Sequence, residues 1–142
     1  MSELHFPDED IDQHFFIGAD PSMDIPHGVH VFVVKTRRAL RRLRQESEGG
    51  DQRNVSAWSY SYDKPDDDDS IGLIVLSSEE LELSLVVHEV THVALHYYGN
   101  TLKPHARASA HIGNHSETLP LMIGNLSAMI WWNLTGTEVK HD

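Results

Sequence analysis

The stretch LELSLVVHEVTHVALHYY, residues 81–98, decides the fold of this chain. Its apolar residues cover most of the circumference of a helix, a pattern that predicts a buried central helix. Ser77 and Glu80 have the spacing of a capping box just before it, and Gly99-Asn100 is a typical signal for its end. We therefore predict one long helix against which the other elements of the chain pack.

The predicted helix contains the motif HEVTH, residues 88–92. Residues four apart in a helix differ by about 40° in azimuth and one turn in height, so His88 and His92 can converge on one zinc ion. Glu89 is offset from both, but near enough to hydrogen-bond a water on the metal, as a general base must. The alternative is a pair of core histidines beside a salt-bridged glutamate, which in a buried helix would need polar partners.

A catalytic zinc site needs three protein ligands and one open position. His96 continues the series of histidines, but it lies about 12 Å from His88 along the helix axis, which excludes it. Glu117, 25 positions after His92, would complete a site of two histidines and one glutamate. Its alternative role is that of a carboxylate favoured by the dipole at a helix start. Other candidates for the third ligand are the loop histidines His105, His111 and His115.

The sequence around this helix predicts an α+β protein. Residues 29–34 and 71–76 are apolar runs typical of strands, and residues 55–62 alternate, with aromatic side chains on one face and small ones on the other. Thr36 is a good cap for a helix that ends near Glu48, with Leu40 and Leu43 facing inward.

The two ends of the chain differ in their patterns. Residues 1–28 have little periodicity, so we predict an irregular arm with a short strand at residues 14–17. Residues 29–142 are then expected to form a single domain. A last helix is predicted to start near residues 114–116 and to end near Leu134.

Composition narrows the classes of function. The chain has no cysteine, so a transition metal must be bound by histidine and carboxylate side chains. A net charge of −11 argues against nucleic acid as a partner. Six of the 11 basic residues fall in residues 35–44, which we interpret as the solvated face of a surface helix. No secretory signal or membrane-spanning run is apparent, so we expect a cytoplasmic protein with no membrane partner.

Two segments, HEVTHVALHYYGN (88–100) and SETLPLMIGNLSAMIWW (116–132), together resemble the zincin-like metallopeptidases of the gluzincin type. They are similar, more narrowly, to small single-domain HExxH proteins of phages and prophages. The resemblance implies a minimal zincin-like domain, in which a small mixed sheet packs against the HExxH helix and a C-terminal helix. In a phage, such a protein would work in the cytoplasm of the host cell.

The resemblance also assigns roles to residues. It implies that His88 and His92 bind zinc, that Glu89 is the general base, and that Glu117 is the ligand on the C-terminal helix. Gly124 and Ala128 would let the two helices approach closely. Leu121 stands where some larger gluzincins have an acidic residue, so the partner that orients the histidine ligands stays unassigned.

The expected function is hydrolysis of a peptide bond in a peptide or protein substrate by a zinc-activated water, with Glu89 as general base. His111 and His115 are the candidates for stabilising the transition state, and Tyr60 and Tyr62 are further ones. The alternative is a non-catalytic, metal-stabilised module that binds a protein partner.

Overall fold

The computed structural model describes residues 5–101 and 117–136. Within these ranges the chain is an α+β protein with three α-helices and one four-stranded mixed sheet of order β1-β2-β4-β3. The strands are β1 (Ile11–Ile17), β2 (Gly28–Val34), β3 (Trp58–Ser61) and β4 (Ser70–Ser77). The helices are α1 (Arg37–Glu48), α2 (Leu83–Thr101) and α4 (Thr118–Thr135), and short 3-10 turns lie at Asp8–Asp10 and Pro21–Met23.

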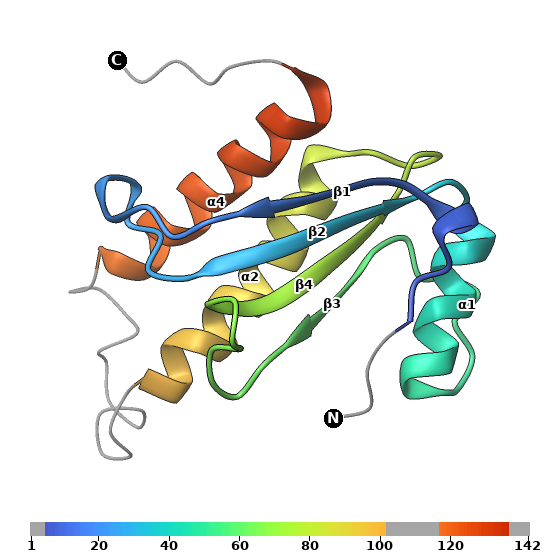
Figure 1. The fold of residues 1–142 in the computed structure, drawn as a ribbon, viewed down its shortest axis with the longest axis horizontal. Helices are drawn as coiled ribbons and strands as arrows, with labels where there is room; N and C mark the ends of the chain where they lie inside the picture. Colours follow the sequence, from blue (N-terminus) through green and yellow to red (C-terminus); the bar gives the residue numbers. More distant parts are fainter. Residues whose placement is uncertain (1–4, 102–116, 137–142) are drawn as a thin grey trace.

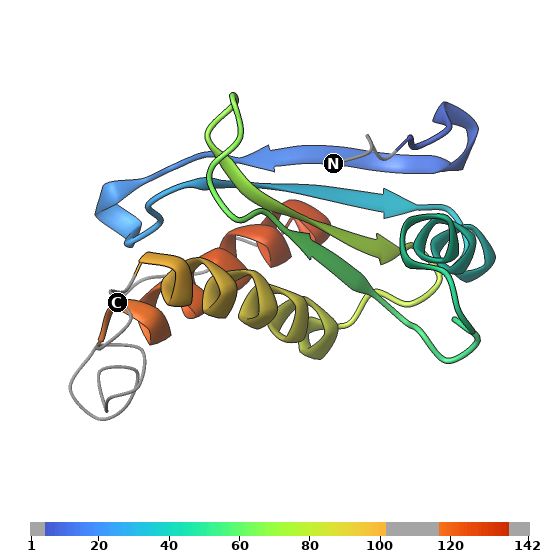
Figure 2. The same ribbon diagram turned by 90° about the horizontal axis from the view of Figure 1, so that it is seen from below.

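The elements form two layers. Figure 2 shows the sheet as one layer and α2 and α4 side by side as the other, while α1 lies at one end of the sheet. β2 and β4 are parallel, and the outer strands β1 and β3 are antiparallel to their neighbours. α2 and α4 run in opposite directions, so that α4 begins on the side where α2 ends (Figure 1).

β4 is buried on both faces. Ile74 and Leu76 belong to the core that the sheet shares with α2 and α4. Leu73 and Val75 belong to a second core under α1. The strand predicted from the apolar run at residues 71–76 is therefore confirmed. The run is continuous because both faces of the strand are covered, which leaves no position that requires a polar residue.

α1 confirms the predicted cap and inward-facing residues. The Thr36 hydroxyl oxygen accepts a hydrogen bond from the Ala39 amide at 3.0 Å, and the helix ends at Gly49, whose φ is +72°. Leu40 and Leu43 are buried. Glycine suits this end because a side chain would strain a positive φ.

The N-terminal region differs from the expectation of an irregular arm. β1 is seven residues long and pairs with β2, and Ile17 and Ile25 are buried in the main core. Residues 11–28 therefore belong to the domain. The periodicity was weak because β1 is an edge strand with one fully buried residue, so most of its positions place no demand on side-chain type.

The bounds of the central helix also differ from the prediction. Ser77 is the last residue of β4, and its hydroxyl oxygen accepts from the Glu79 amide at 3.1 Å in a turn before the helix. The prediction of a capping box is therefore wrong, because Ser77 pairs with Val34 as the last residue of β4 and does not begin the helix. α2 also continues past Gly99 to Thr101, whose hydroxyl donates to the Tyr98 carbonyl at 2.8 Å.

α4 packs by a different face from the one expected. Gly124 is exposed, and a Cβ built on it would meet no atom within 4 Å, so it does not mediate close approach to α2. The buried positions of this helix are Leu119, Met122, Leu126, Ser127 and Ile130. The predicted start at residues 114–116 lies outside the described residues. Among the helices described, none is long and apolar enough to cross a membrane.

Replacing Gly72 by alanine is expected to lower the free energy of unfolding by about 1–3 kcal/mol. The new Cβ would lie 2.6 Å from the carbonyl oxygen of Tyr60 and 3.4 Å from a methyl of Val93. Gly124→Ala is the matched control, expected to add about 0.4–1 kcal/mol through helix propensity. Urea denaturation measures both. Equal stability of Gly72→Ala and the wild type would contradict the close approach of β3 to β4.

Candidate metal centre and catalytic cavity

The two histidines of the motif lie side by side on α2. His88 Nε2 and His92 Nε2 are 3.1 Å apart, with ring planes at 80°. Two zinc–nitrogen bonds of about 2.0–2.1 Å at a tetrahedral angle would separate the nitrogens by about 3.3–3.4 Å. The pair therefore has nearly the separation that two ligands of one zinc ion require.

Glu89 lies at the edge of the core, next to the two histidines. Its side chain is only 7% exposed, whereas that of His88 is 64% exposed. Its Oε2 lies 3.9 Å from His88 Nε2, the one polar contact that the described residues give it. Glu89 also lines the cavity beside this pair, so a side chain that is mostly buried still borders open space.

A cavity of about 760 Å³ opens beside these three residues. α2 forms one wall with the motif residues and with Ser84, Leu85 and His96. The opposite wall is formed by β3 and by the segment before it, with Arg44 of α1 at the margin. The lining residues from these parts are Asn54, Val55, Ser56, Ala57, Ser59 and Ser61.

β3 separates its two kinds of side chain as its alternation predicted. Trp58 is buried beneath α1, and its indole N–H donates to the Leu40 carbonyl at 3.1 Å. Ser59 and Ser61 face the cavity. β3 pairs only with β4, so its other edge keeps backbone groups with no strand partner among the described residues.

The structure does not bring Glu117 to the histidine pair. Glu117 is exposed at the start of α4, its side chain makes no capping hydrogen bond, and it is not among the residues that line the cavity. α4 begins near the far end of α2, while His88 and His92 lie in the first half of α2 (Figure 1). Within the described residues, no three histidine, aspartate or glutamate side chains are grouped to hold a metal ion.

The remaining predicted site residues lie elsewhere. His96 lines the cavity, but its Nε2 contacts Asp63 at 3.1 Å. Tyr60 and Tyr62 do not line this cavity; burial, then the carboxylates of Asp66 and Asp68, raise the pKa of Tyr62. The candidates His105, His111 and His115 lie outside the described residues.

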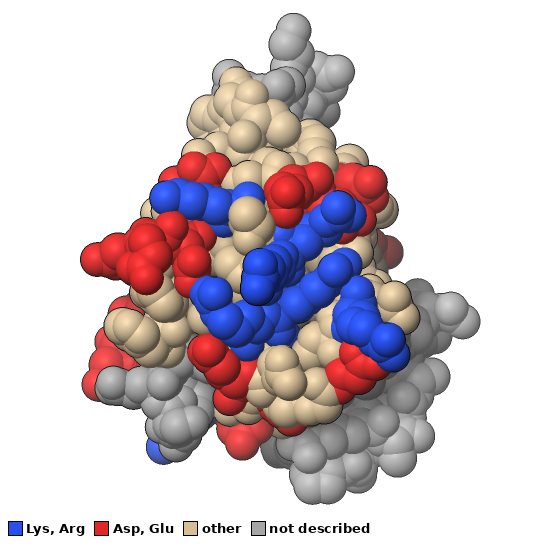
Figure 3. Space-filling model, turned by 90° about the vertical axis from the view of Figure 1, so that its right-hand side faces the viewer, with Lys and Arg blue, Asp and Glu red and all other residues tan. Residues whose placement is uncertain are grey.

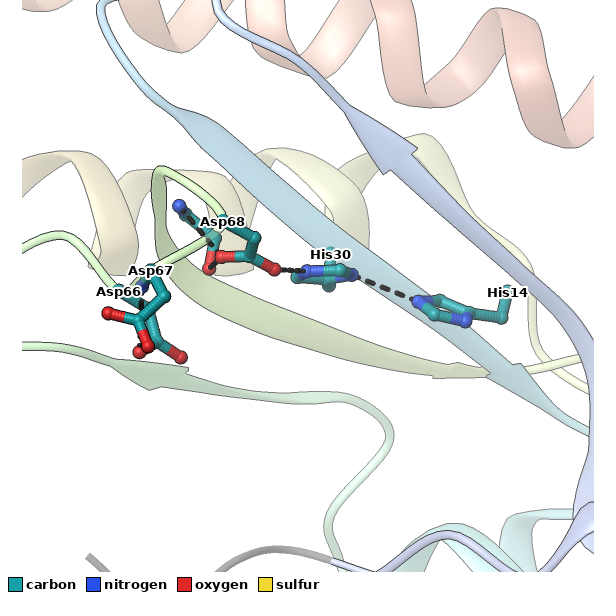
Figure 4. Close-up of polar contacts among 6 residues, drawn as sticks. His14, His30, Asp66, Asp67 and Asp68 are labelled. Carbon is teal, nitrogen blue, oxygen red and sulfur yellow. Dashed lines mark hydrogen bonds and ion pairs between the residues drawn. The ribbon is translucent and has the colours of Figure 1, made fainter.

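A second polar cluster, which sequence reasoning missed, joins β1, β2 and the acidic turn before β4 (Figure 4). His30 Nε2 lies 2.5 Å from an Asp68 carboxylate oxygen, which can only accept, and His30 Nδ1 lies 3.0 Å from His14 Nε2. The Ser70 hydroxyl donates to the same carboxylate at 2.5 Å. No sequence signal links His14, His30 and Asp68, because they lie on two strands and a turn that are far apart along the chain.

Comparisons with known proteins add no relative. No family model, no curated protein and no solved structure matches this chain. The function must therefore be argued from the residues and their geometry alone.

The His14–His30–Asp68 cluster is expected to make the protein less stable as the pH falls. The Ser70 hydroxyl and His30 lower the pKa of Asp68 below its ordinary value of 3.8. Burial, then His30, lower the pKa of His14 below 6.5. Both shifts make the unfolded chain the better proton acceptor, so stability present at high pH is lost as pH falls, first below 6.5 and then below 3.8.

Asp68→Asn tests this cluster. The variant is expected to be less stable than the wild type at pH 7 and to lose less stability on acidification, because it has no carboxylate to protonate. Asp67→Asn is the control, since Asp67 makes no histidine contact among the described residues. Urea denaturation between pH 7.5 and pH 3, values chosen to bracket both ordinary pKa values, gives the measurement. Parallel pH profiles for Asp68→Asn and Asp67→Asn would refute the assignment.

Proposed function

We propose that this protein is a metal-dependent hydrolase that cleaves peptide bonds, with zinc held by His88 and His92 and with Glu89 as the general base. One observation carries the proposal. A pair of imidazole nitrogens 3.1 Å apart and a carboxylate only 7% exposed share one wall of a 760 Å³ cavity. This donor set and spacing suit zinc, and the chain has no thiolate to compete.

The zinc, when bound, supplies Lewis acidity toward the scissile carbonyl and lowers the pKa of water near it. Glu89 takes a proton from the attacking water as the new C–O bond forms at the carbonyl carbon. It then gives a proton to the amine nitrogen as the C–N bond breaks. Its low exposure favours this role, since exclusion of water strengthens electrostatic interactions within the site.

The substrate chain would lie along β3. The free edge of β3 borders the cavity, and an extended peptide can add to such an edge through backbone hydrogen bonds. Ser59 and Ser61 are small, so they leave room between this edge and α2. Peptide backbone pairing gives affinity without strong sequence preference, which suits a peptidase.

The third ligand is the part of the proposal that the described residues do not supply. Glu117 stays the prediction from sequence, and its position at the start of α4 gives it no added support. The rival role, a metal that only holds helices together, has less support. His88 is largely exposed on the cavity side of α2, and α2 already packs against α4 through apolar residues.

Zinc binding tests the ligand assignment. Purified protein is expected to bind one zinc ion per chain, and His88→Ala and His92→Ala are each expected to lose stoichiometric binding, because one helix supplies both nitrogens. His96→Ala is the matched control on the same helix, expected to bind normally. Metal content after dialysis and competition with a chelating dye measure this. Normal zinc binding by the His88→Ala,His92→Ala double variant would overturn the site, and loss of zinc by Glu117→Ala would assign the third ligand.

Glu89→Gln tests the mechanism. The amide has the same shape but accepts no proton, so the turnover number is expected to fall by about 10²–10⁴. Zinc content and melting temperature should stay near the wild-type values. Release of new amino groups from a denatured protein substrate measures activity. Wild-type turnover by this variant would show that Glu89 is not the base.

A further inference from the structure

The positive charge of this acidic chain is concentrated on one face. Seven of the 11 lysine and arginine residues lie between positions 35 and 53, although the net charge is −11. Figure 3 shows lysine and arginine side chains gathered on the face of the molecule where α1 lies, with carboxylates beside them. Arg42, Arg44 and Arg53 form ion pairs with carboxylates, so they contribute less to the free positive charge than their unpaired neighbours.

This face contains a groove of about 740 Å³. The exposed face of α1 forms one side, and the loop after it forms the other. We call this the arginine groove, and its lining residues are Arg37, Arg38, Arg41, Arg42, Gln45, Gly50, Asp51, Gln52, Arg53 and Glu79.

Two of these guanidinium groups are available for a ligand. The Arg38 side chain has no hydrogen bond or ion pair with any described residue. Arg41 donates through Nε to the Val55 carbonyl at 3.0 Å, which leaves its terminal N–H groups unassigned. Arg42, by contrast, is paired with Asp10.

Part of this charge supports the helix, because Arg42 and Arg44 form ion pairs with carboxylates one turn along α1, but the arginines of the first turn form no such pair within it. Arg37 and Arg38 occupy the first turn of α1, which contains no acidic residue, although the helix dipole favours acidic residues there. Arg37 and Arg41 are like charges four residues apart, an arrangement that weakens a helix. Carboxylates from outside the helix compensate Arg37, whose amide donates to Glu79 at 2.7 Å, but the Arg38 side chain has no such partner among the described residues.

The arginine groove adjoins the candidate catalytic cavity. Arg53 lines the groove and the next residue, Asn54, lines the cavity. Arg41 lines the groove and holds the carbonyl of Val55, which lines the cavity. The loop between α1 and β3 therefore separates the arginine groove from the catalytic cavity. A peptide a few residues long can reach from one to the other.

We infer that the arginine groove binds a carboxylate-rich segment of the peptide substrate, which places the neighbouring residues in the catalytic cavity. This inference rests on the proposed peptidase function. Guanidinium groups bind carboxylates through paired hydrogen bonds, which suits Arg38 and Arg41. A nucleic acid is a poorer fit, because a long phosphate chain would extend beyond the groove over a protein whose net charge is −11, whereas a short acidic segment need not.

The binding test uses a short fluorescein-labelled peptide of alternating Glu and Ser, with a Gln and Ser peptide for comparison. The wild type is expected to bind the acidic peptide more tightly, with affinity that falls as salt rises. Arg38→Glu should weaken this binding by about threefold to tenfold. Lys64→Glu is the matched control: it makes the same change in net charge at an exposed position outside the groove, and it should bind like the wild type.

Arg38→Glu should leave folding intact, because Arg38 is exposed and a glutamate suits the first turn of a helix. Its melting temperature should therefore equal or exceed that of the wild type. Equal affinity of wild type and Arg38→Glu for the acidic peptide would overturn the inference. Tighter binding of a single-stranded DNA oligonucleotide, lost in Arg38→Glu, would also overturn it in favour of nucleic acid.

A cleavage test separates this inference from the proposed function. In a peptide library analysed by mass spectrometry, cleaved peptides should be enriched in Asp or Glu on one side of the scissile bond. Arg38→Glu should raise KM for acidic peptides and leave kcat unchanged. Cleavage without such enrichment would refute the groove but not the peptidase. Binding of the acidic peptide without any cleavage would support the groove and refute the peptidase.

Discussion

The rotation of α2 about its own axis is the constraint on which the candidate site depends. Val90 and Val93 are buried between the sheet and α4. Because successive helical residues turn by about 100°, this buried stripe fixes the direction of every other side chain on α2. Glu89 then falls at the margin of the core, and His88 and His92 fall toward β3 and the cavity. Apolar packing and ligand geometry are therefore specified together, and neither can change without the other.

β3 connects the packed core to the wall of the cavity that lies across from α2. Burying a tryptophan removes about 150–250 Å² of surface from water, worth on the order of 4–6 kcal/mol. Trp58 is buried in this way, and its hydrogen bond to Leu40 ties the strand to α1. Ser59 and Ser61, on the other face, contribute little to the core. The strand is thus held by one face and left free to border the cavity by the other.

Much of this fold and part of the candidate site could be predicted from local signals in the sequence. The cap at Thr36, the buried strand at residues 71–76 and the HEVTH motif each depend on residues a few positions apart, so short-range patterns reveal them. Long-range contacts have no such local signal. Pairing with β2 kept Ser77 in β4, and the fold brought His14 to His30 across 16 residues and His30 to Asp68 across 38. The place of Glu117 depends on how α4 packs against α2, which spacing along the chain does not encode.

α1 separates its core-forming residues from its exposed arginines, so the two sets make no conflicting demand on the helix. Its buried residues Ala39, Leu40 and Leu43 close the second core, while Arg37, Arg38 and Arg42 are exposed to solvent. The two sets lie on opposite faces, so the charged face can vary with little cost to packing. Arg41 and Arg44 lie between them, and both reach toward the loop or the cavity beside β3. The helix therefore contacts the wall of the candidate catalytic cavity directly, through Arg44 and through the hydrogen bond from Arg41 to Val55.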